Sequence, residues 1–326
     1  MHKNDILRML RTSDSGFVSG TELAALLGVS RTAVWKHIRS LERDGYGIEA
    51  VPSKGYRLTA SPDVIAVDDL LSGLPAGHIV GSRIRYIRET ASTNTIAVEL
   101  AQQGAPEGTI VLAETQTGGR GRLGRTWASP RGNVYLSVVL RPALPMSKAP
   151  LITLVGAVAV AAAVRTYPGL EAGIKWPNDV LLSGKKVSGL LSELSAETDR
   201  IRHIVLGIGV NVNMDPRELP ADVRPLATTL VAVAGRPVDR TVFLRHLLGE
   251  LDRWYKHFLK DEAAVLAEWR TLNVTIGRRV AVRGGGPALE GLARDIDDEG
   301  RLLVQLDTGS VHRVSAGDVT IVKGTV

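Results

Sequence analysis

The sequence contains no cysteine among its 326 residues, and aromatic residues make up only 4% of it. The lack of cysteine excludes disulfide bonds, thiol nucleophiles and cysteine-based zinc sites. The longest uncharged apolar run, residues 151–164, is shorter than the roughly 20 residues that a membrane-spanning helix needs, so we expect a buried helix there. The N-terminus carries charges where a signal peptide has its apolar stretch. These absences favour a cytoplasmic protein with no membrane partner.

The remaining composition is that of an ordinary globular protein. Hydrophobic residues make up 44% and charged residues 23% of the chain, which excludes a fibrous or wholly disordered protein. Lysine and arginine total 40 against 34 acidic residues, a formal net charge of +6. That balance permits an anionic partner such as DNA or a nucleotide without requiring one. At roughly 150 residues per domain, the length suggests two or three domains.

The first segment, residues 1–61, is predicted to be a winged helix-turn-helix domain. Residues 19–22 form a capping box before a short helix that Gly28 ends. The charged N-terminus is predicted to form a short helix before these, and a third helix is expected over residues 31–43. Two short β-rich runs around residues 52–55 then indicate a β-hairpin, the wing.

The helix over residues 31–43 has two contrasting faces. Val34, Ile38 and Leu41 recur at i, i+4 and i+7 and are expected to be buried. The opposite face carries a tryptophan among basic and polar residues, which is unusual for packing alone. A helix-turn-helix places its second helix in the major groove and its basic residues on phosphates. The predicted DNA-binding residues are Ser30, Arg31, Thr32, Trp35, Lys36, Arg39 and Lys54.

The charge of this segment supports DNA as its partner. Residues 1–60 hold nine lysine or arginine residues against six acidic ones, and a basic excess on a helix-turn-helix is the footprint of nucleic-acid binding. The alternative is a winged helix that serves only as a protein contact.

Two further domains are predicted after a linker at Ser61 and Pro62. Residues 63–272 mix strand and helix patterns, and residues 273–326 hold five short alternating runs that suggest a small β-barrel. In the central domain, strands are expected over residues 83–89, 108–113, 133–140, 186–194 and 203–212, and helices over residues 93–103, 151–164 and 241–272.

A glycine- and arginine-rich loop, GGRGRLGRTW over residues 118–127, is the first candidate for chemistry. It matches G-x-G-x-x-G, the glycine pattern of dinucleotide sites. Such a site needs a helix directly after the glycines and an acidic residue about 20 positions on. Here a tryptophan, a proline and then a strand follow the glycines, so the dinucleotide interpretation fails. A kinase loop is excluded because H-R-D and D-F-G motifs are missing. What remains is a flexible loop whose arginines suit phosphate or carboxylate oxygens. Taken alone, they are equally typical of an exposed basic turn.

The run KWPNDVLLSGKKVSGLLSE, from Lys175, is the second candidate. Pro177 breaks a strand and leaves Asn178 and Asp179 free to meet a ligand. Lys186 begins the next strand, and its compact charge suits a phosphate that gains charge during a reaction. The run is not a P-loop, because the required upstream glycine is missing. The alternative is an ordinary hairpin with two solvated lysines.

Two shorter motifs complete the set. Ser92, Thr93 and Asn94 open a helix, either as a plain N-cap or as donors to a polar ligand group. GIGVN, residues 207–211, ends an apolar strand. Its alternative interpretation is close packing at the glycines, with Asn211 as a satisfied core amide.

Together these four stretches resemble the biotin–protein ligase family, and the whole chain resembles its bifunctional members, which are also biotin operon repressors. Their order and spacing are specific to this family. The resemblance implies an α+β fold with a winged helix-turn-helix, a class II synthetase-like mixed α/β ligase domain and an SH3-like β-barrel. The matching stretches are Ser92-Thr93-Asn94, ETQTGGRGRLGRTW from Glu114, KWPND from Lys175, Lys186-Val187-Ser188-Gly189 and GIGVN from Gly207.

The resemblance also implies a reaction and partners. Such enzymes join biotin to ATP, giving biotinyl-5′-adenylate and pyrophosphate, and then pass biotin to a lysine of a biotin carboxyl carrier domain of acetyl-CoA carboxylase or a similar carboxylase. Mg²⁺ is expected with the ATP phosphates, with no metal-ligating residue assigned. Operator DNA and a ligand-promoted homodimer complete the expected partners.

Residue roles follow from the same resemblance. The implied catalytic residues are Lys186 and Arg122. Those implied for biotin are Ser92, Thr93, Asn94, Gln116, Gly119, Arg120, Arg122, Lys186 and Gly189. Those implied for ATP or the adenylate are Arg122, Arg125, Trp127, Lys175, Asn178, Asp179 and Asn211, with Trp127 near adenine. The sequence departs from some members at Leu123, where they have a basic residue, and at Ser53, where their wing has a glycine.

Two alternative functions remain. Lipoate ligases share the central architecture and the adenylate chemistry, but they usually lack the GRGRxGR loop and the winged helix. A ligand-sensing repressor that binds without turnover would keep the fold, but the intact arginine and lysine positions argue against it.

Overall fold

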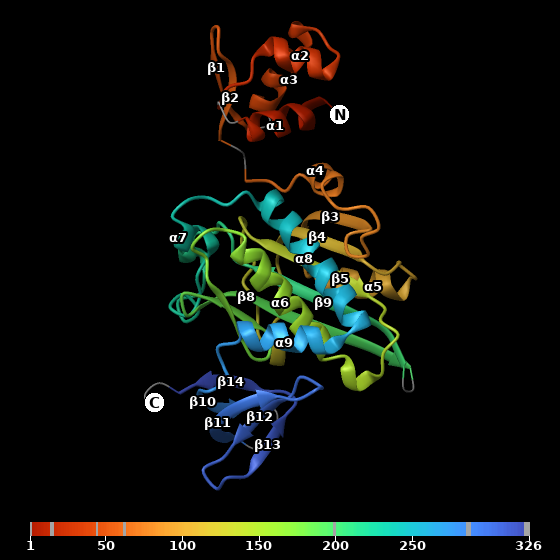
Figure 1. The fold of residues 1–326 in the computed structure, drawn as a ribbon, viewed down its shortest axis with the longest axis vertical. Coiled ribbons are helices and arrows are strands. Elements are labelled where there is room, and N and C mark those ends of the chain that lie inside the picture. Colours follow the sequence, from red (N-terminus) through yellow and green to blue (C-terminus); the bar gives the residue numbers. More distant parts are fainter. Residues whose placement is uncertain are drawn as a thin grey trace. The chain divides into compact units, whose positions relative to one another are not determined.

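The computed structural model divides the chain into two compact units, Met1–Asp69 and Leu70–Val326 (Figure 1). Each unit has its own hydrophobic core and is described by itself. The predicted linker at Ser61 and Pro62 lies outside the described residues. The structure describes residues 2–13, 16–43, 45–60, 63–197, 200–284 and 288–322.

The N-terminal unit packs three helices against a two-stranded antiparallel sheet. Ser19 Oγ accepts a hydrogen bond from the Glu22 amide at 3.0 Å, and Gly28 ends the same helix with φ of +63°. Both ends of this helix are as predicted. The elements are α1 (His2–Thr12), α2 (Gly20–Leu27), α3 (Arg31–Arg43), β1 (Gly47–Val51) and β2 (Gly55–Ala60), followed by α4 (Val67–Ser72).

Helix α3 has the two faces that its sequence predicts. Val34, Ile38 and Leu41 are buried in the core of the unit, whereas Trp35 is 49% exposed. Ser30 Oγ accepts from the Ala33 amide at 3.1 Å and so caps the helix.

The wing is held against the helices through Val18. The amide of Val18 donates to Tyr56 O, and the amide of Tyr56 donates to Val18 O, both at 2.9 Å. Gly55 permits this approach, because a Cβ there would lie 2.1 Å from Val18 O. At the wing turn Ser53 has φ of +68°, a left-handed conformation that glycine adopts without strain. Ser53 therefore stands in a conformation that favours glycine, the residue that some family members have there.

A seven-stranded sheet in the order β3-β4-β5-β9-β8-β7-β6 forms the centre of the second unit. Strands β3 and β4 are parallel and joined by α5 (Thr93–Gln102), and the other neighbouring pairs are antiparallel. The sequence indicates a strand that Pro177 breaks but gives no bounds for β6 and β7, the two short strands on either side of this proline. The strands are β3 (Arg83–Thr90), β4 (Thr109–Gln116), β5 (Val134–Leu140), β6 (Ala172–Lys175), β7 (Asp179–Leu182), β8 (Lys185–Glu197) and β9 (Arg200–Val210).

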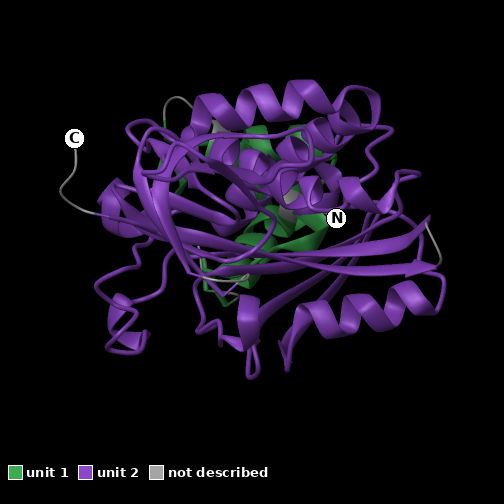
Figure 2. Ribbon diagram, turned by 90° about the horizontal axis from the view of Figure 1, so that it is seen from below, with its two compact units in different colours: residues 1–69 green, residues 70–326 purple. Residues whose placement is uncertain are grey.

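Helices cover both faces of this sheet (Figure 2). Ala97 and Ala101 of α5 pack on one face, and α6 (Leu151–Arg165) packs on the other, under α8 (Arg240–Lys260) and α9 (Glu262–Leu272). Gly156 lets α6 approach closely, since a Cβ there would lie 2.5 Å from Leu190. The segment Met146–Arg165 has the length and apolar composition of a membrane span, but 72% of it is buried inside the fold. The predicted buried helix is confirmed. A short helix, α7 (Leu230–Ala234), precedes α8.

The C-terminal residues form a five-stranded antiparallel sheet in the order β13-β12-β11-β10-β14. Trp176, which is buried, joins it to the central domain: its amide donates to Thr275 Oγ1 and its indole N–H to Gly300 O, both at 2.9 Å. The strands are β10 (Arg279–Arg283), β11 (Leu289–Ile296), β12 (Leu302–Gln305), β13 (Val311–Val314) and β14 (Asp318–Ile321).

A buried ion pair connects α8 to the sheet. Arg240 Nη1 lies 2.9 Å from Glu114 Oε2 and 2.8 Å from the carbonyl of Asn133. Tyr86 donates its hydroxyl to the other oxygen of Glu114 at 2.7 Å. Burial, together with this bond to a carboxylate, raises the pKa of Tyr86. Helix α8 and strands β3 and β4, with Asn133 just before β5, thus meet at one charged pair.

We expect Arg240→Met to lower the free energy of unfolding by about 3–5 kcal/mol, because it leaves the Glu114 carboxylate buried without its cation. Adding Glu114→Leu should recover most of the loss, since a pair replaced by apolar side chains leaves no buried charge. Urea denaturation of the single and double variants measures both effects. The exposed pair of Arg202 and Glu197 supplies the control: Arg202→Met should cost less than about 1 kcal/mol. A double variant less stable than Arg240→Met would contradict the argument.

Candidate active site

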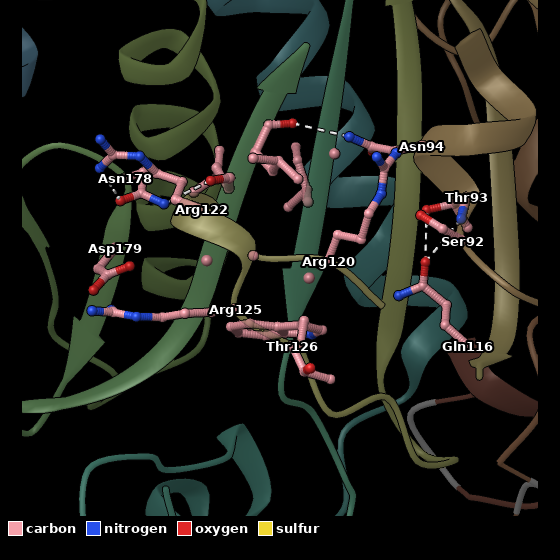
Figure 3. Close-up of a pocket in the computed structure, with 18 of the residues that line it drawn as sticks. Ser92, Thr93, Asn94, Gln116, Arg120, Arg122, Arg125, Thr126, Asn178 and Asp179 are labelled. Carbon is pink, nitrogen blue, oxygen red and sulfur yellow. Dashed lines mark hydrogen bonds between the residues drawn. The ribbon is translucent and has the colours of Figure 1, made fainter. Parts of the chain in front are cut away.

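One pocket in the second unit collects most of the predicted binding residues (Figure 3). Strands β8 and β9, the start of α5, the loop of residues 118–127, the turn between β6 and β7, and the start of β14 all contribute to its walls. The predicted residues that line it are Ser92, Thr93, Asn94, Gln116, Arg120, Arg122, Arg125, Trp127, Asn178, Asp179, Lys186 and Gly189.

The start of α5 and the end of β4 form an uncharged polar end of the pocket. Gln116 Oε1 accepts from the amide of Thr93 at 2.9 Å and from its hydroxyl at 3.2 Å. Gln116 Nε2 in turn donates to Ser129 Oγ at 2.9 Å. Ser92 is the N-cap residue of α5, yet its side chain makes no capping bond. A plain N-cap therefore does not explain this motif, and the Ser92 hydroxyl lines the pocket instead.

The indole of Trp127 packs directly against two glycines, Gly189 and Gly209, which we call the glycine floor. Gly189 and Gly209 are direct partners on β8 and β9. A Cβ at Gly189 would lie 2.8 Å from the ring, and one at Gly209 would lie 2.6 Å from Nε1. Lys186 Nζ lies 5.3 Å from the ring centroid. The two glycines thus allow a flat aromatic surface to lie beside a cation, an arrangement suited to stacking a planar ring that carries phosphate groups.

Cations gather at the other end of the pocket. Lys186 Nζ lies 2.5 Å from Asp179 Oδ1, and Lys175 Nζ lies 3.9 Å from Oδ2 of the same carboxylate. Arg122 Nη1 donates to Asn178 Oδ1 at 3.2 Å and to the carbonyl of Gly317 at 3.4 Å. Burial lowers the pKa of Arg122, but a guanidinium stays charged in proteins.

The loop that carries the arginines is a compact turn. The Gly121 amide donates to Arg125 O at 2.7 Å, and the Trp127 amide donates to Gly119 O at 2.9 Å. At the tip Leu123 has φ of +55° and is 56% exposed. Because the loop is short and closed, its arginine side chains point to different elements.

Each arginine of the loop has partners on a separate element. Arg120 pairs with Glu193 of β8 at 2.9 Å. Arg122 bonds Asn178, between β6 and β7, and Arg125 pairs with Asp318, the first residue of β14. The C-terminal sheet therefore contributes directly to the pocket.

Three residues with predicted ligand roles lie outside the lining of the pocket: Gly119, Lys175 and Asn211. Gly119 closes the loop, and a Cβ there would lie 2.4 Å from Trp127 O. Asn211 is buried and donates to Thr228 O at 3.1 Å, which matches the alternative of a satisfied core amide. Their ligand roles stay predictions.

The structure also brings in residues that sequence reasoning missed. Asp318 lines the pocket from 193 positions away from its partner Arg125, and Glu193 and Ser137 hold lining residues in place. No local motif marks these three, because their contacts arise only from folding. Among the described residues, no group of three or more histidine, aspartate or glutamate side chains is placed to hold a metal ion.

The predicted DNA-binding residues lie on the N-terminal unit. Arg31, Thr32 and Trp35 of α3 line a groove together with the wing residues Pro52 and Ser53. The predicted set is exposed throughout: Ser30, Arg31, Thr32, Trp35, Lys36, Arg39 and Lys54.

Comparison with known families agrees with this arrangement. Residues 2–57 match a helix-turn-helix domain, residues 86–211 match the biotin/lipoate A/B protein ligase family, and residues 275–322 match the biotin protein ligase C-terminal domain. The class is thus a protein ligase that carries a helix-turn-helix domain.

Individual relatives are similar along the chain. The bifunctional ligase/repressor BirA of Bacillus subtilis is 38% identical over 321 residues, 98% of each chain. A biotin–[acetyl-CoA-carboxylase] ligase of Mycobacterium tuberculosis is 38% identical over 219 residues, 65% of this chain and 79% of that protein. The biotin protein ligase from Aquifex aeolicus in complex with biotin and ATP superposes with a TM-score of 0.64 at 29% identity, covering 74% of this chain and 100% of that one. The chain belongs to the biotin protein ligase family, among its bifunctional ligase/repressor members.

The glycine floor generates a prediction. We expect Gly209→Ala to displace Trp127, because the added methyl would lie 2.6 Å from the indole nitrogen. Loss of one stacking surface should weaken ATP binding by about tenfold, the scale of one base–aromatic stack. Calorimetric titration with ATP measures this, and the tryptophan fluorescence should change as well. Gly249→Ala, on α8 with nothing within 4 Å of the added Cβ, is the control. An unchanged affinity would exclude stacking on Trp127.

Proposed function

We propose that this chain activates biotin with ATP to biotinyl-5′-adenylate and transfers biotin to a lysine of a carrier domain. The supporting observation is the division of one pocket into an uncharged polar end, with Thr93 and Gln116, and a cationic end, with Lys186 and Arg122. A cyclic urea is neutral and hydrogen-bonding, so it suits the first end. A carboxylate and a triphosphate are anionic, so they suit the second.

The first step joins two anions. A carboxylate oxygen of biotin attacks the α-phosphorus of ATP, and the bond to the bridging oxygen of pyrophosphate breaks. Lys186 and Arg122 lower the repulsion between the reactants and stabilise the charge that develops on the phosphate. Asp179 Oδ1, 2.5 Å from Lys186 Nζ, holds that lysine in position. In the second step a lysine amine of the acceptor attacks the biotinyl carbonyl, and AMP leaves.

The arginine loop protects the intermediate. A mixed anhydride is labile to water, so a loop that covers it has a clear use. Arg120, Arg122 and Arg125 give the loop a grip on carboxylate and phosphate oxygens.

Mg²⁺ fits as a companion of the ATP phosphates. It commonly keeps several waters and binds through one or two carboxylates plus phosphate oxygens. The carboxylates that line the pocket are Asp179 and Asp318, and both are already paired with cations. The ion would therefore be held largely by phosphate and water. Of the two carboxylates, Asp179 is the one beside the catalytic lysine and would be the protein ligand.

The acceptor and the compartment belong to the same proposal. The relative from Mycobacterium tuberculosis carries acetyl-CoA carboxylase in its name, so we propose the biotin carboxyl carrier domain of that enzyme or a similar carboxylase as the acceptor. A ligase that uses ATP and binds DNA is expected in the cytoplasm.

A lipoate-protein ligase is the second candidate, since the matching family model covers both substrates. The observation against it is the full-length similarity to ligase/repressors, including the helix-turn-helix. Radiolabelled biotin and lipoate, offered separately with a carrier domain, discriminate between the two. Incorporation of biotin also excludes a repressor without turnover.

We expect Lys186→Ala to reduce adenylate formation by about a hundred- to a thousandfold, the usual result of removing one preorganised contact to the transition state. Pyrophosphate release at saturating biotin and ATP measures the rate. Lys185→Ala supplies the matched control, because Lys185 is the exposed neighbour on the same strand. A Lys186→Ala variant within about threefold of the wild type would remove this lysine from the mechanism, since one kcal/mol is under tenfold in rate.

The N-terminal unit extends the proposal to repression. Its exposed basic face on α3 and its wing suit the major groove and the adjacent phosphates. A helix-turn-helix usually reads two half-sites as a dimer. We therefore propose that biotinyl-adenylate orders the loop of residues 118–127 and favours a homodimer, which places two α3 helices one or more turns of DNA apart.

This coupling has a thermodynamic test. If the adenylate tightens operator binding, operator DNA must tighten adenylate binding by the same factor. Sedimentation and titration of a palindrome upstream of a biotin synthesis operon, with and without a non-reactive adenylate analogue, should show both shifts. Lys36→Ala is the control: it should flatten the salt dependence by about one unit and leave dimerisation unchanged. An analogue that binds tightly but shifts neither equilibrium would refute the repressor part alone.

A further inference from the structure

Glu193 of β8 touches two parts of the pocket with one oxygen atom. Its Oε1 accepts from Asn94 Nδ2 at 2.7 Å and from Arg120 Nη2 at 2.9 Å. Asn94 belongs to the first turn of α5, and Arg120 belongs to the arginine loop. A single carboxylate therefore connects the polar end of the pocket to the loop that covers it.

The carboxylate fixes the orientation of the Asn94 amide. Asn94 is buried, and an ionised carboxylate can only accept hydrogen bonds, so Nδ2 must face Glu193. The amide oxygen then faces Ser137 Oγ, 2.5 Å away. Ser137 Oγ lies 2.7 Å from Thr93 Oγ1, which bonds Gln116. Asn94 Nδ2 also donates to the carbonyl of Leu191 at 3.3 Å, so Glu193 and this carbonyl together set which way the polar groups of this end donate and accept.

Glu193 also holds the first half of the arginine loop. The Arg120 guanidinium also donates to Thr95 Oγ1 at 3.4 Å, a long contact. Figure 3 shows the Arg120 side chain extending towards Asn94. Arg122 and Arg125 are held by other elements, so Glu193 is the anchor specific to Arg120.

We infer that Glu193 is a positioning residue for the biotin site, which orients Asn94 and fastens the loop at Arg120 over the polar end. The inference rests on the proposed function for the identity of the ligand. An ordinary exposed ion pair contributes little to stability, and the pair with Arg120 alone would fit that description. The additional bond to the buried Asn94 amide distinguishes Glu193 from such a pair, because a charge-assisted hydrogen bond is roughly twice as strong as a neutral one.

Two substitutions separate the two contacts. Glu193→Gln keeps an oxygen that accepts from Asn94 and removes the charge that attracts Arg120. Glu193→Leu removes both contacts. Glu197→Gln is the matched control, because Glu197 lies on the same strand and pairs with Arg202 on an exposed surface.

The first measurement is steady-state pyrophosphate release by the full chain, with biotin and ATP varied separately. We expect the KM for biotin to rise about threefold in Glu193→Gln and about thirtyfold in Glu193→Leu, as one and then two polar contacts are lost. The KM for ATP should stay within about twofold in both variants, since neither contact involves the cationic end. A KM for biotin that is unchanged in both variants, or an equal rise for biotin and ATP, would overturn the inference.

The second measurement is independent of activity. Trypsin cleaves after arginine, so release of the loop should speed cleavage after Arg120 in Glu193→Gln but not in Glu197→Gln, without ligands present. Faster cleavage with an unchanged KM for biotin would reduce Glu193 to a structural tether and reject its positioning role. A wild-type chain that releases no pyrophosphate with biotin would refute the proposed function instead, while the cleavage experiment would still test the tether.

Discussion

The pocket depends on the pairing of its cations with carboxylates. Lys186 pairs with Asp179, Arg120 with Glu193 and Arg125 with Asp318. Several cations in one partly buried space repel one another, and that repulsion is only weakly screened away from water. Counter-charges on β7, β8 and β14 offset it. The site can therefore form only when the central sheet and the C-terminal sheet are both in place.

The same pairing determines what the substrates encounter. A cation already bound to a carboxylate is held in place, so it loses less entropy when a ligand oxygen replaces or joins that partner. The drawback is competition: each incoming anion must displace a carboxylate from its cation or share that cation with it. Arg122 differs from the other two arginines of the loop in that its contacts are an amide oxygen and a backbone carbonyl. No carboxylate is hydrogen-bonded to Arg122 among the described residues, so a phosphate oxygen would have to replace only neutral acceptors there.

Local features of the fold could be predicted from the sequence because short-range physics produces them. The cap at Ser19, the buried stripe of α3 and the apolar run of α6 each depend on neighbours within a few residues. Strands β6 and β7 were harder to predict, because four-residue strands on either side of Pro177 show no clear alternation.

The site residues also fall into those that the sequence could predict and those that it could not. Its motif residues are recognisable by type and spacing, and most of the residues so predicted line one pocket. Glu193, Ser137 and Asp318 carry no local signal, since each acts through a partner that folding brings close. Asn211 shows the opposite case. It stands in a motif, but its buried amide bonds the backbone at Thr228 and lies outside the pocket lining.

The charge pairs also suggest how ligand state could be transmitted to the rest of the chain. ATP brings several negative charges, whereas the adenylate keeps one phosphate. Arg120 and Arg125 of the arginine loop pair with carboxylates on β8 and β14, so under the proposed function ATP and the adenylate would draw these two arginines from their carboxylates to different extents. A loop whose anchors depend on ligand charge is a suitable two-state element, and reciprocity then links its ordered state to any assembly that the ordered state favours. The N-terminal unit has its own core, so in the proposed homodimer the spacing of two such units, without any rearrangement inside them, would change the affinity for paired half-sites.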